Sequence, residues 1–150
     1  MKEHPDETCT ISTDKACLDV QLIHDFLSRS SYWARGRSLE QVRTSIENSL
    51  CFGAYEGRRE VGFARVVTDY ATFAWLCDVF VLEPHRGRGI GKRLVQAVVD
   101  HPTLRDLRLM ILATRDAQGL YKEYGGFGAI EKPSRWMTRH ASASGADGAR

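Results

Sequence analysis

The chain has 150 residues, 43% of them hydrophobic, and a formal net charge of +2. This length predicts one domain, residues 1–140, with enough apolar side chains for a core. The nearly balanced charge argues against nucleic acid or a membrane surface as a partner, and no apolar run approaches the about 18 residues of a membrane span. Residues 1–7 do not resemble a signal peptide, and four widely spaced cysteines indicate reduced thiols, so we expect a cytoplasmic protein. The five histidines lack metal-ligand spacing, so no metal is expected.

The first third of the chain predicts a short edge strand and two helices. The strand is expected at residues 10–13. Apolar side chains at helical spacing predict the first helix over about residues 19–28. Ser38 and Gln41 have the spacing of a capping box, which predicts a second helix over residues 39–48.

The middle of the chain predicts a three-stranded meander followed by a helix. The strands are expected at residues 50–55, 61–68 and 73–82. The first two form an antiparallel hairpin in this interpretation. Apolar residues at helical spacing then predict a helix from Ile90 to His101-Pro102, where proline removes an N–H group and stops the helix.

The last third predicts a strand, a short helix and further strand pieces. Residues 107–113 are expected to form a central strand. The helix after it begins near Asp116, a plausible cap, and stops at Gly125-Gly126. Ile130 and residues 136–138 suggest two final strand pieces. Residues 1–9 and 141–150 are expected to be a loose head and a disordered tail. This order of elements predicts a mixed α/β sheet.

The turn before the third predicted helix is rich in glycine and in cations. Glycines at alternate positions (Gly87, Gly89 and Gly91) permit torsions that a Cβ would forbid. Free N–H groups at the start of a helix bind anions, and the helix dipole favours negative charge there. The cations of the turn are Arg86, Arg88, Lys92 and Arg93. A strand, a basic glycine-rich turn and a helix in this order predict a diphosphate site.

Two common phosphate-binding motifs do not fit this turn. A Walker loop would need glycine at Arg86 and a hydroxyl side chain at Arg93. A dinucleotide fingerprint that starts at Gly87 would need glycine at Lys92. The pattern that remains is Arg-x-x-Gly-x-Gly, from Arg86 to Gly91. The alternative interpretation is an ordinary strand–turn–helix with a solvated basic turn.

The pattern from Arg86 to Gly91 resembles the acetyl-CoA loop of the GNAT acyltransferase superfamily. Residues 76–81 are similar to the family's fourth strand. Leu120-Tyr121-x-x-x-Gly125 is similar to the family's Leu-Tyr-x-x-x-Gly-Phe signature, with Gly126 as one extra residue before the phenylalanine. The resemblance covers about residues 50–137 and extends to a small bacterial subgroup of predicted N-acetyltransferases without an assigned substrate. It implies a GNAT-like fold in which the fourth and fifth strands splay apart.

The resemblance implies acetyl-CoA as the co-substrate. Its pantetheine arm would pair with the backbone of the fourth strand, and its pyrophosphate would lie on the amides of the glycine-rich turn. The residues implied in cofactor binding are Phe80, Val81, Arg86, Gly87, Arg88, Gly89, Ile90, Gly91, Lys92, Asp116 and Tyr121.

Acetyl transfer to an amine by direct attack needs an acid and a base. Tyr121 matches the family tyrosine that protonates the departing sulfur, and a phenol with a pKa near ~10 is protonated at neutral pH. A core aromatic at this position is the alternative, and Tyr124 competes for the role. Asp78 is the candidate base or amine ligand, since related diamine acetyltransferases carry Glu-Asp where this chain has Cys77-Asp78. Asp69, a water chain, or an Asp78 carboxylate bonded within the strand region stay open as alternatives.

An aromatic and basic segment between the first two helices would line the acceptor mouth in such a fold. The residues expected to bind the acceptor are Tyr32, Trp33, Arg35 and Asp69, with Arg37 beside them. Aromatic faces and arginines suit a small primary amine that also carries an anionic or aromatic part; covering the core is the alternative for the aromatics. The competing function is a CoA-binding sensor or regulatory module with a degenerate active site. A homodimer is possible, because exposed sheet edges in such folds often pair.

Overall fold

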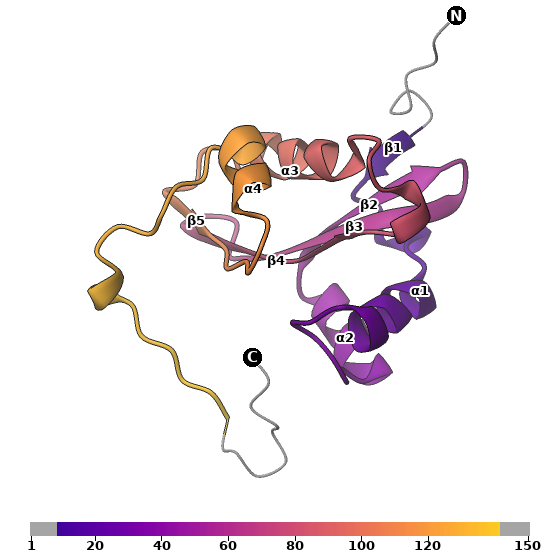
Figure 1. Cartoon of the computed structure of the whole chain (residues 1–150), viewed down its shortest axis with the longest axis horizontal. Coiled ribbons are helices and arrows are strands. Elements are labelled where there is room, and N and C mark those ends of the chain that lie inside the picture. The colour runs from indigo at the N-terminus through magenta and orange to yellow at the C-terminus, as the bar shows by residue number, and fades with distance from the viewer. Residues whose placement is uncertain (1–8, 142–150) are drawn as a thin grey trace, which may run out of the picture.

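The computed structural model describes residues 9–141, and in it a five-stranded mixed sheet separates two groups of helices (Figure 1). The strands are β1 (Cys9–Ser12), β2 (Leu50–Glu56), β3 (Arg59–Thr68), β4 (Phe73–Val81) and β5 (Leu109–Ile111). They lie in the order β1-β2-β3-β4-β5; the first four are antiparallel neighbours, and β5 runs parallel to β4. The predicted mixed α/β sheet is confirmed.

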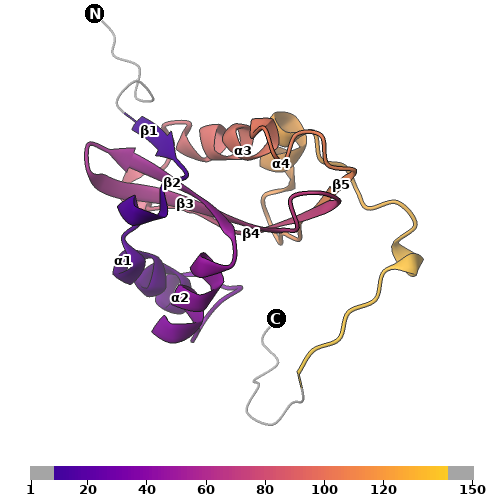
Figure 2. The same cartoon turned by 180° about the vertical axis from the view of Figure 1, so that it is seen from behind.

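Each face of the sheet carries one pair of helices (Figures 1 and 2). The helices are α1 (Val20–Asp25), α2 (Leu39–Glu47), α3 (Ile90–Asp100) and α4 (Gln118–Gly125). The core between the sheet and α1 and α2 includes Ile23, Leu27, Val42, Phe63 and Phe80. The core on the α3 and α4 side includes Val66, Leu76, Leu94, Val98 and Tyr121. Among residues 9–141, no helix combines the length and the apolar character that crossing a bilayer would need.

The predicted helix ends agree with the structure at three places and differ at two. Ser38 and Gln41 form both bonds of the capping box at the start of α2, and α3 ends at Asp100, directly before His101. Helix α4 stops at Gly125, followed by Gly126 with a φ of 73°. The cap predicted at Asp116 is wrong, because the Ala117 N–H donates to Thr114 Oγ1 at 3.2 Å and the Asp116 side chain makes no cap bond. The first helix is also shorter than predicted and continues as a π-helical turn.

The predictions for the last strands differ from the structure, although β5 does lie within the predicted residues 107–113. Strand β5 has three residues and lies at the edge of the sheet, not in its centre. Residues 130 and 136–138 are not strands: the segment of residues 128–141, here called the C-terminal arm, is exposed throughout and contains one 3-10 turn, Pro133–Arg135. The apolar pattern alone cannot supply the neighbouring strand that a strand needs for its hydrogen bonds. The predicted head, apart from Cys9, and all of the predicted tail except Ala141 lie outside the described residues.

A buried carboxyl group lies beside the start of α1. Glu60, near the start of β3, is 2% exposed, and its Oε1 accepts a hydrogen bond from the Asp19 N–H at 2.8 Å. Its Oε2 has no hydrogen-bond partner among the residues that the structure describes. Burial raises the pKa of Glu60 to about 8, against the lowering effect of the Asp19 N–H. The folded protein therefore keeps this proton over a pH range in which the unfolded chain has released it.

We expect the Glu60 contribution to the free energy of unfolding to fall as the pH rises from about 4.5 to about 8, because only the folded state still binds the proton there. Glu60→Gln should remove this pH dependence and should raise the Tm above that of the wild type near pH ~9. Thermal unfolding of both proteins at about pH 5 and about pH 9 measures the difference. Glu47→Gln, at an exposed position of α2, is the matched control. An identical pH dependence in Glu60→Gln and wild type would contradict the assignment.

Candidate functional site

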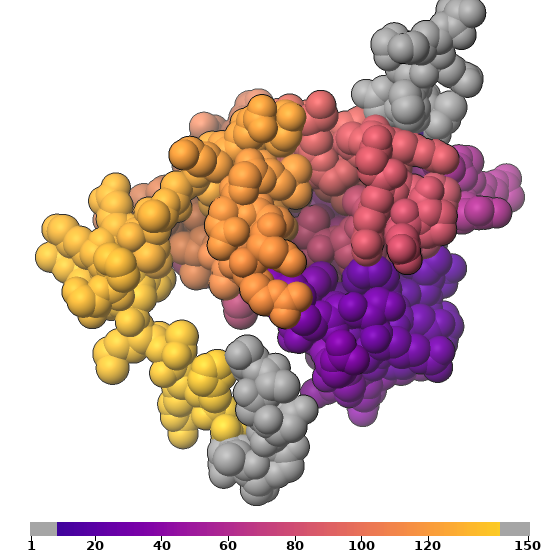
Figure 3. Space-filling view, viewed as in Figure 1, coloured from indigo at the N-terminus to yellow at the C-terminus, as the bar shows by residue number. Residues whose placement is uncertain are grey.

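Strands β4 and β5 separate partway along the sheet. Their pairing ends at Trp75 and Ile111, although β4 continues to Val81. From Leu76 onwards, the edge of β4 that faces away from β3 therefore has no β5 neighbour. Figure 3 shows a hollow between the orange segment that includes α4 and the coral segment before α3. The predicted splay of the fourth and fifth strands is present, and it leaves backbone groups of β4 open to a ligand.

A β-bulge lies where this gap begins. Leu76 is opposite Val66 in β3, but Val79 is opposite Ala64, so β4 contains one residue more than its partner here. After the bulge, Val79 still packs toward α3 and α4, whereas Phe80 packs into the core beneath α1 and α2. Bulges bend a strand and change the direction of a side chain, and they are common beside functional sites. This bulge turns Asp78 toward the segment between α1 and α2.

The glycine-rich turn connects the end of β4 to α3. Gly87 and Gly89 both have a φ of 81°, and Gly89 is the N-cap of α3. A Cβ on Gly91 would lie 3.8 Å from the Val81 side chain and 4.0 Å from the Leu120 side chain. Gly91 therefore lies between β4 and α4, the two borders of the gap. The unpaired N–H groups at the start of α3 and the positive end of its dipole consequently lie at the gap, between β4 and α4.

Three cations of the turn are held by neighbouring elements. Arg86 Nε donates to the Val81 carbonyl at 2.9 Å. Arg88 Nη1 lies 2.7 Å from a carboxylate oxygen of Glu56 at the end of β2. The Lys92 ammonium lies 5.0 Å from the centre of the Tyr124 ring. These contacts fix the turn against the sheet and against α4, so the structure brings the predicted cofactor residues 80–92 together at one end of the gap.

Tyr121 lies on the α4 side of the gap. It is buried, and its ring meets Phe127 edge-on with the ring centres 6.0 Å apart. Burial raises the pKa of Tyr121 to about 12, with smaller contributions from Tyr32 and Asp116. The phenol is therefore protonated at neutral pH and is available as a proton donor.

Asp78 is at the centre of a buried polar network. The residue is 1% exposed. Its Oδ1 accepts from Trp33 Nε1 at 2.7 Å, and its Oδ2 accepts from Arg37 Nη1 at 2.8 Å and from Arg65 Nε at 2.7 Å. Arg65 Nη1 also donates to Ser49 Oγ at 3.0 Å. One carboxylate thus joins three elements: β4, β3 and the segment of residues 31–37, here called the aromatic loop.

The aromatic loop also contacts the far side of the gap. Tyr32 Oη accepts a hydrogen bond from the Arg115 N–H at 2.8 Å, and the Arg115 guanidinium lies 3.9 Å from the centre of the Tyr32 ring. Arg115 belongs to the segment between β5 and α4. The Tyr32 ring packs edge-on against Trp33 at 5.1 Å. The loop therefore bridges the two borders of the gap, next to Tyr121.

The other predicted site residues lie outside this cluster. Asp69 caps the turn between β3 and β4: the Thr72 hydroxyl and amide and the Ala71 amide bond its carboxylate and hold its pKa well below the usual range. Arg35 is exposed on the aromatic loop. Asp116 is exposed too, with a carboxylate oxygen 4.0 Å from Arg115 Nη2.

Sequence reasoning missed two residues of the Asp78 network. Arg65 is the one charged residue in the apolar run of residues 61–67, and a charge in such a run signals a buried partner. Ser49 gives no comparable signal, because a serine after a helix is common. Arg37 was predicted near the acceptor, and the structure ties it to Asp78.

The chain is similar to proteins described as acetyltransferases in each comparison with known proteins. The family model described as “Acetyltransferase (GNAT) family” matches residues 20–127, well over half of the chain. “Putative acetyltransferase FG08082” from Gibberella zeae is 32% identical over 127 residues, which covers 69% of this chain and 71% of that protein. “Uncharacterized N-acetyltransferase ycf52” from Gracilaria tenuistipitata var. liui is 30% identical over 111 residues, which covers 69% of this chain but 60% of that protein.

A solved structure is similar over most of the chain. The crystal structure of the GNAT-family protein xcc2953 from Xanthomonas campestris pv. campestris superimposes with a TM-score of 0.85 and 50% identity, covering 88% of this chain and 92% of that one. With the family model and the curated relatives, this similarity leads to one conclusion: the chain belongs to the acetyltransferase (GNAT) family.

Proposed function

We propose that the protein transfers an acetyl group from acetyl-CoA to a primary amine on a small molecule, by direct attack. The observation that carries this proposal is the meeting of three features at one gap. These are the open edge of β4, the glycine-capped start of α3, and the protonated phenol of Tyr121. Each of them matches a need of thioester chemistry.

The cofactor would occupy the gap between β4 and β5. The amides from Arg86 to Lys92 would bind its pyrophosphate, because N–H groups at a helix start favour anions. The backbone of Phe80 and Val81 would pair with the pantetheine arm, as an added strand pairs with a sheet edge. The Phe80 side chain stacks on Phe26 at 4.0 Å, in the core on the other side of the sheet, so its backbone is held firmly in place.

Tyr121 would act as the general acid. When the amine attacks the thioester carbonyl, the carbon–sulfur bond breaks and the departing sulfur takes up a proton. Tyr121 belongs to α4, which borders the gap, and it is our candidate for the donor of that proton. A well-placed acid contributes roughly 10²–10⁴-fold to the rate.

The contacts of Asp78 support a positioning role for this residue rather than the role of general base. Both of its oxygens already accept hydrogen bonds, from Trp33, Arg37 and Arg65. These donors compete with the amine proton for the same lone pairs. We therefore favour the alternative in which Asp78 positions the aromatic loop and the amine proton leaves through water.

The charges around the aromatic loop suggest the acceptor class. Arg115 lies over the Tyr32 ring, partly exposed Arg37 shares Asp78 with Trp33, and Arg35 is exposed on the same loop. Such a mouth repels a polycation and attracts an acceptor with a carboxylate. The favoured acceptor is a small primary amine that also carries a carboxylate or an aromatic ring.

An acceptor panel tests the function. CoA-thiol release is measured with acetyl-CoA and four amine classes: aromatic amines, amino carboxylates, aliphatic diamines and short peptides. We expect turnover with the first two classes. Turnover with peptides alone would overturn the small-molecule assignment, and turnover with diamines alone would overturn the role of the arginines.

The second candidate is a CoA-binding sensor with a degenerate active site. The occupied lone pairs of Asp78, together with Cys77 in place of a glutamate, favour it. Calorimetric binding of CoA without thiol release for any amine would identify the sensor. Absence of CoA binding would exclude both candidates.

Gly91→Ala should weaken CoA binding by at least about tenfold without lowering the Tm. An alanine at this helical position favours the helix by roughly 1 kcal/mol over glycine, and its Cβ would meet protein atoms only at 3.8 and 4.0 Å. A loss of CoA affinity would therefore mean that the alanine Cβ occupies space that the ligand needs beside β4. Calorimetric titration with CoA measures it.

Gly119→Ala is the matched control for this substitution. Gly119 also lies in a helix, and a Cβ there would have no heavy atom within 4 Å. We expect unchanged CoA affinity in this variant. Equal affinities in wild type, Gly91→Ala and Gly119→Ala would place the cofactor elsewhere.

A further inference from the structure

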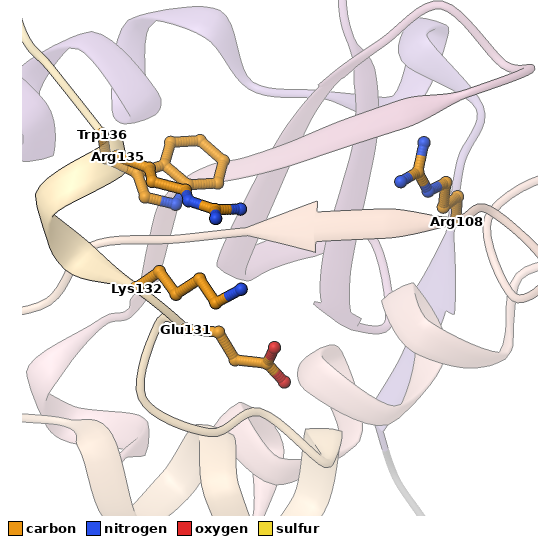
Figure 4. Close-up of a pocket in the computed structure, with 5 residues that line it drawn as sticks. All are labelled: Arg108, Glu131, Lys132, Arg135 and Trp136. Carbon is orange, nitrogen blue, oxygen red and sulfur yellow. The ribbon is translucent and has the colours of Figure 1, made fainter.

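A groove beside α2 and a hollow beside the C-terminal arm both contain arginine side chains, but the two differ in how their cations are held. The hollow beside the arm is lined only by exposed residues, which Figure 4 shows: Arg108, Glu131, Lys132, Arg135 and Trp136. Water solvates such cations well, so an anion adds little to their stability. The groove beside α2, here called the α2 groove, contains a cation that is mostly withdrawn from water.

The α2 groove lies between helix α2 and strand β3. It is about 440 Å³ in volume, within the roughly 300–1,000 Å³ that is common for small-molecule sites. The polar residues on its helix side include Thr44, Ser45 and Asn48, and β3 contributes Arg65 and Val67. A ligand in this groove would therefore meet hydroxyl and amide groups on one wall, and a guanidinium beside an apolar side chain on the other.

Arg65 has one guanidinium nitrogen left for a ligand. Its Nε donates to Asp78, and its Nη1 donates to Ser49. Among residues 9–141, Nη2 has no hydrogen-bond partner, and it is not one of the buried side-chain atoms in that state. Because Arg65 lines the α2 groove, Nη2 can be reached from there. The side chain as a whole is only 12% exposed, so little water surrounds its charge.

The charges around Arg65 do not balance. Asp78 Oδ2 lies 2.8 Å from Arg37 Nη1 and 2.7 Å from Arg65 Nε, so two guanidinium groups share one carboxylate. Glu40 also lines the groove, but within the described part of the chain it forms no ion pair with either arginine. A cation that is largely removed from water needs a counter-charge. A ligand carboxylate at Nη2 would bring the cluster to two charges of each sign.

The wall beside this donor is apolar. Val67 is 36% exposed and lies opposite Trp75 in the register of β3 and β4, and Trp75 is 46% exposed. Opposite residues of neighbouring strands have their side chains on the same face of the sheet. Arg65 is on that face too, because it precedes Val67 by two positions in the same strand. A ligand that carries an apolar group next to its carboxylate would therefore cover both surfaces at once.

We propose that the α2 groove binds a small organic carboxylate, with its oxygens on Arg65 Nη2 and its apolar group on Val67 and Trp75. The groove lies across β4 from the gap, because Arg65 and Val67 belong to β3 and the open edge of β4 faces away from β3. The carboxylate is therefore a second ligand and not the acceptor of the acetyl group. It shares Arg65 with Asp78, which couples it to the aromatic loop through Trp33. The inference does not depend on the acetyl-transfer proposal.

A titration with phenylacetate tests the site. Amide spectra of the ¹⁵N-labelled full chain are recorded with phenylacetate and with phenylacetamide, its uncharged analogue. We expect shifts at the amides of Ser45, Ser49 and Val67, and a Kd for phenylacetate at least about tenfold below that for phenylacetamide, because only the carboxylate gains a charge-assisted hydrogen bond. Equal Kd values, no shift at these amides, or shifts confined to the aromatic loop would overturn the proposal.

Substitutions that add a negative charge to the α2 groove test its location. Val67→Glu places a carboxylate of the chain itself beside Arg65, so phenylacetate should bind at least about tenfold more weakly. Thr44→Glu adds the same charge from an exposed position of α2 and should weaken binding as well, which keeps the test valid if Val67→Glu does not fold. Ile130→Glu changes an exposed apolar side chain outside the groove and should bind as the wild type does. Wild-type affinity in Thr44→Glu and in a folded Val67→Glu would contradict the proposal.

Calorimetric titration with CoA separates the α2 groove from the gap. With phenylacetate at saturation, the Kd for CoA should stay within about twofold of its value without phenylacetate, because the two ligands occupy opposite sides of β4. Displacement of phenylacetate by CoA would place the carboxylate in the gap and overturn the inference. A chain that binds phenylacetate in the groove but does not bind CoA would support this inference and exclude the acetyl-transfer proposal.

Discussion

Tyr121→Phe should lower kcat by roughly 10²–10⁴-fold, which is the contribution of a well-placed general acid, while the Kd for CoA stays within about twofold. The substitution removes only the hydroxyl. The ring is buried against Phe127, and phenylalanine keeps that contact, so the fold and the cofactor site stay in place. Initial rates of thiol release and calorimetric CoA binding measure the two quantities separately.

Tyr124→Phe is the matched control, because Tyr124 lies on the same helix and was the competing acid. Its ring faces the Lys92 ammonium at 5.0 Å, and phenylalanine keeps most of that interaction. We expect a change in kcat of less than about threefold, because this substitution does not remove the proposed proton donor. If Tyr124→Phe loses turnover and Tyr121→Phe does not, the roles of the two tyrosines are exchanged. If both keep wild-type rates, neither phenol is the acid.

The pH profile of the wild type adds a further check on the acid. A general acid works only while it is protonated, so its ionisation produces a loss of activity above its pKa. Burial raises the pKa of Tyr121 to about 12. We therefore expect kcat to stay level on the alkaline side up to about pH 10. An unperturbed phenol, with a pKa near ~10, would already begin to lose activity below that pH.

Asp78→Asn should lower the free energy of unfolding by about 3–5 kcal/mol, the usual result of removing one partner from a buried ion pair. The new amide would place its N–H₂ group against the N–H donors of Trp33, Arg37 or Arg65, which now all bond the carboxylate. Arg65, with a side chain 12% exposed, would keep its charge without a counter-charge. Because a domain of this size has only about 5–15 kcal/mol in total, the variant should unfold at markedly lower denaturant concentration. Urea unfolding followed by tryptophan fluorescence measures the change.

Two controls separate this effect from a catalytic one. Asp106→Asn removes a carboxylate whose side chain is 90% exposed, and it should change stability by less than about 0.5 kcal/mol. A double-mutant cycle of Asp78→Asn with Arg65→Met should give a coupling energy above about 1 kcal/mol, since the two side chains share a hydrogen bond. An Asp78→Asn protein with wild-type stability but strongly reduced turnover would identify Asp78 as the base instead.

Local patterns predicted the local features well. The capping box at Ser38, the stop at Gly125-Gly126 and the positive φ of Gly87 and Gly89 each depend on residues that are close in sequence. Their physical causes are backbone torsion and nearby hydrogen bonds. The family resemblance added the splay between β4 and β5, which no local pattern contains.

The features that the sequence did not predict depend on distant residues. The facing of Asp78 follows from a bulge that is defined only by the register of β4 against β3. Its partner Arg65 is thirteen positions away, and Trp33 and Arg37 come from another element altogether. The edge position of β5 and the detached arm likewise depend on which strands pair, and an apolar alternation does not specify a pairing partner.

The bulge in β4 has a consequence for how variants of this fold should be compared. The extra residue at Cys77-Asp78 bends the strand at the point where pairing with β5 has just ended. The pairing with β5 ends at Trp75 and Ile111, so the extra residue lies in the part of β4 whose outer edge has no β5 neighbour. A chain of this fold that lacks the extra residue would keep the regular alternation of β4 and would direct the side chain at position 78 toward the opposite face of the sheet. The contacts of Asp78 should therefore be transferred to a related chain only where that chain has the same number of residues at this point.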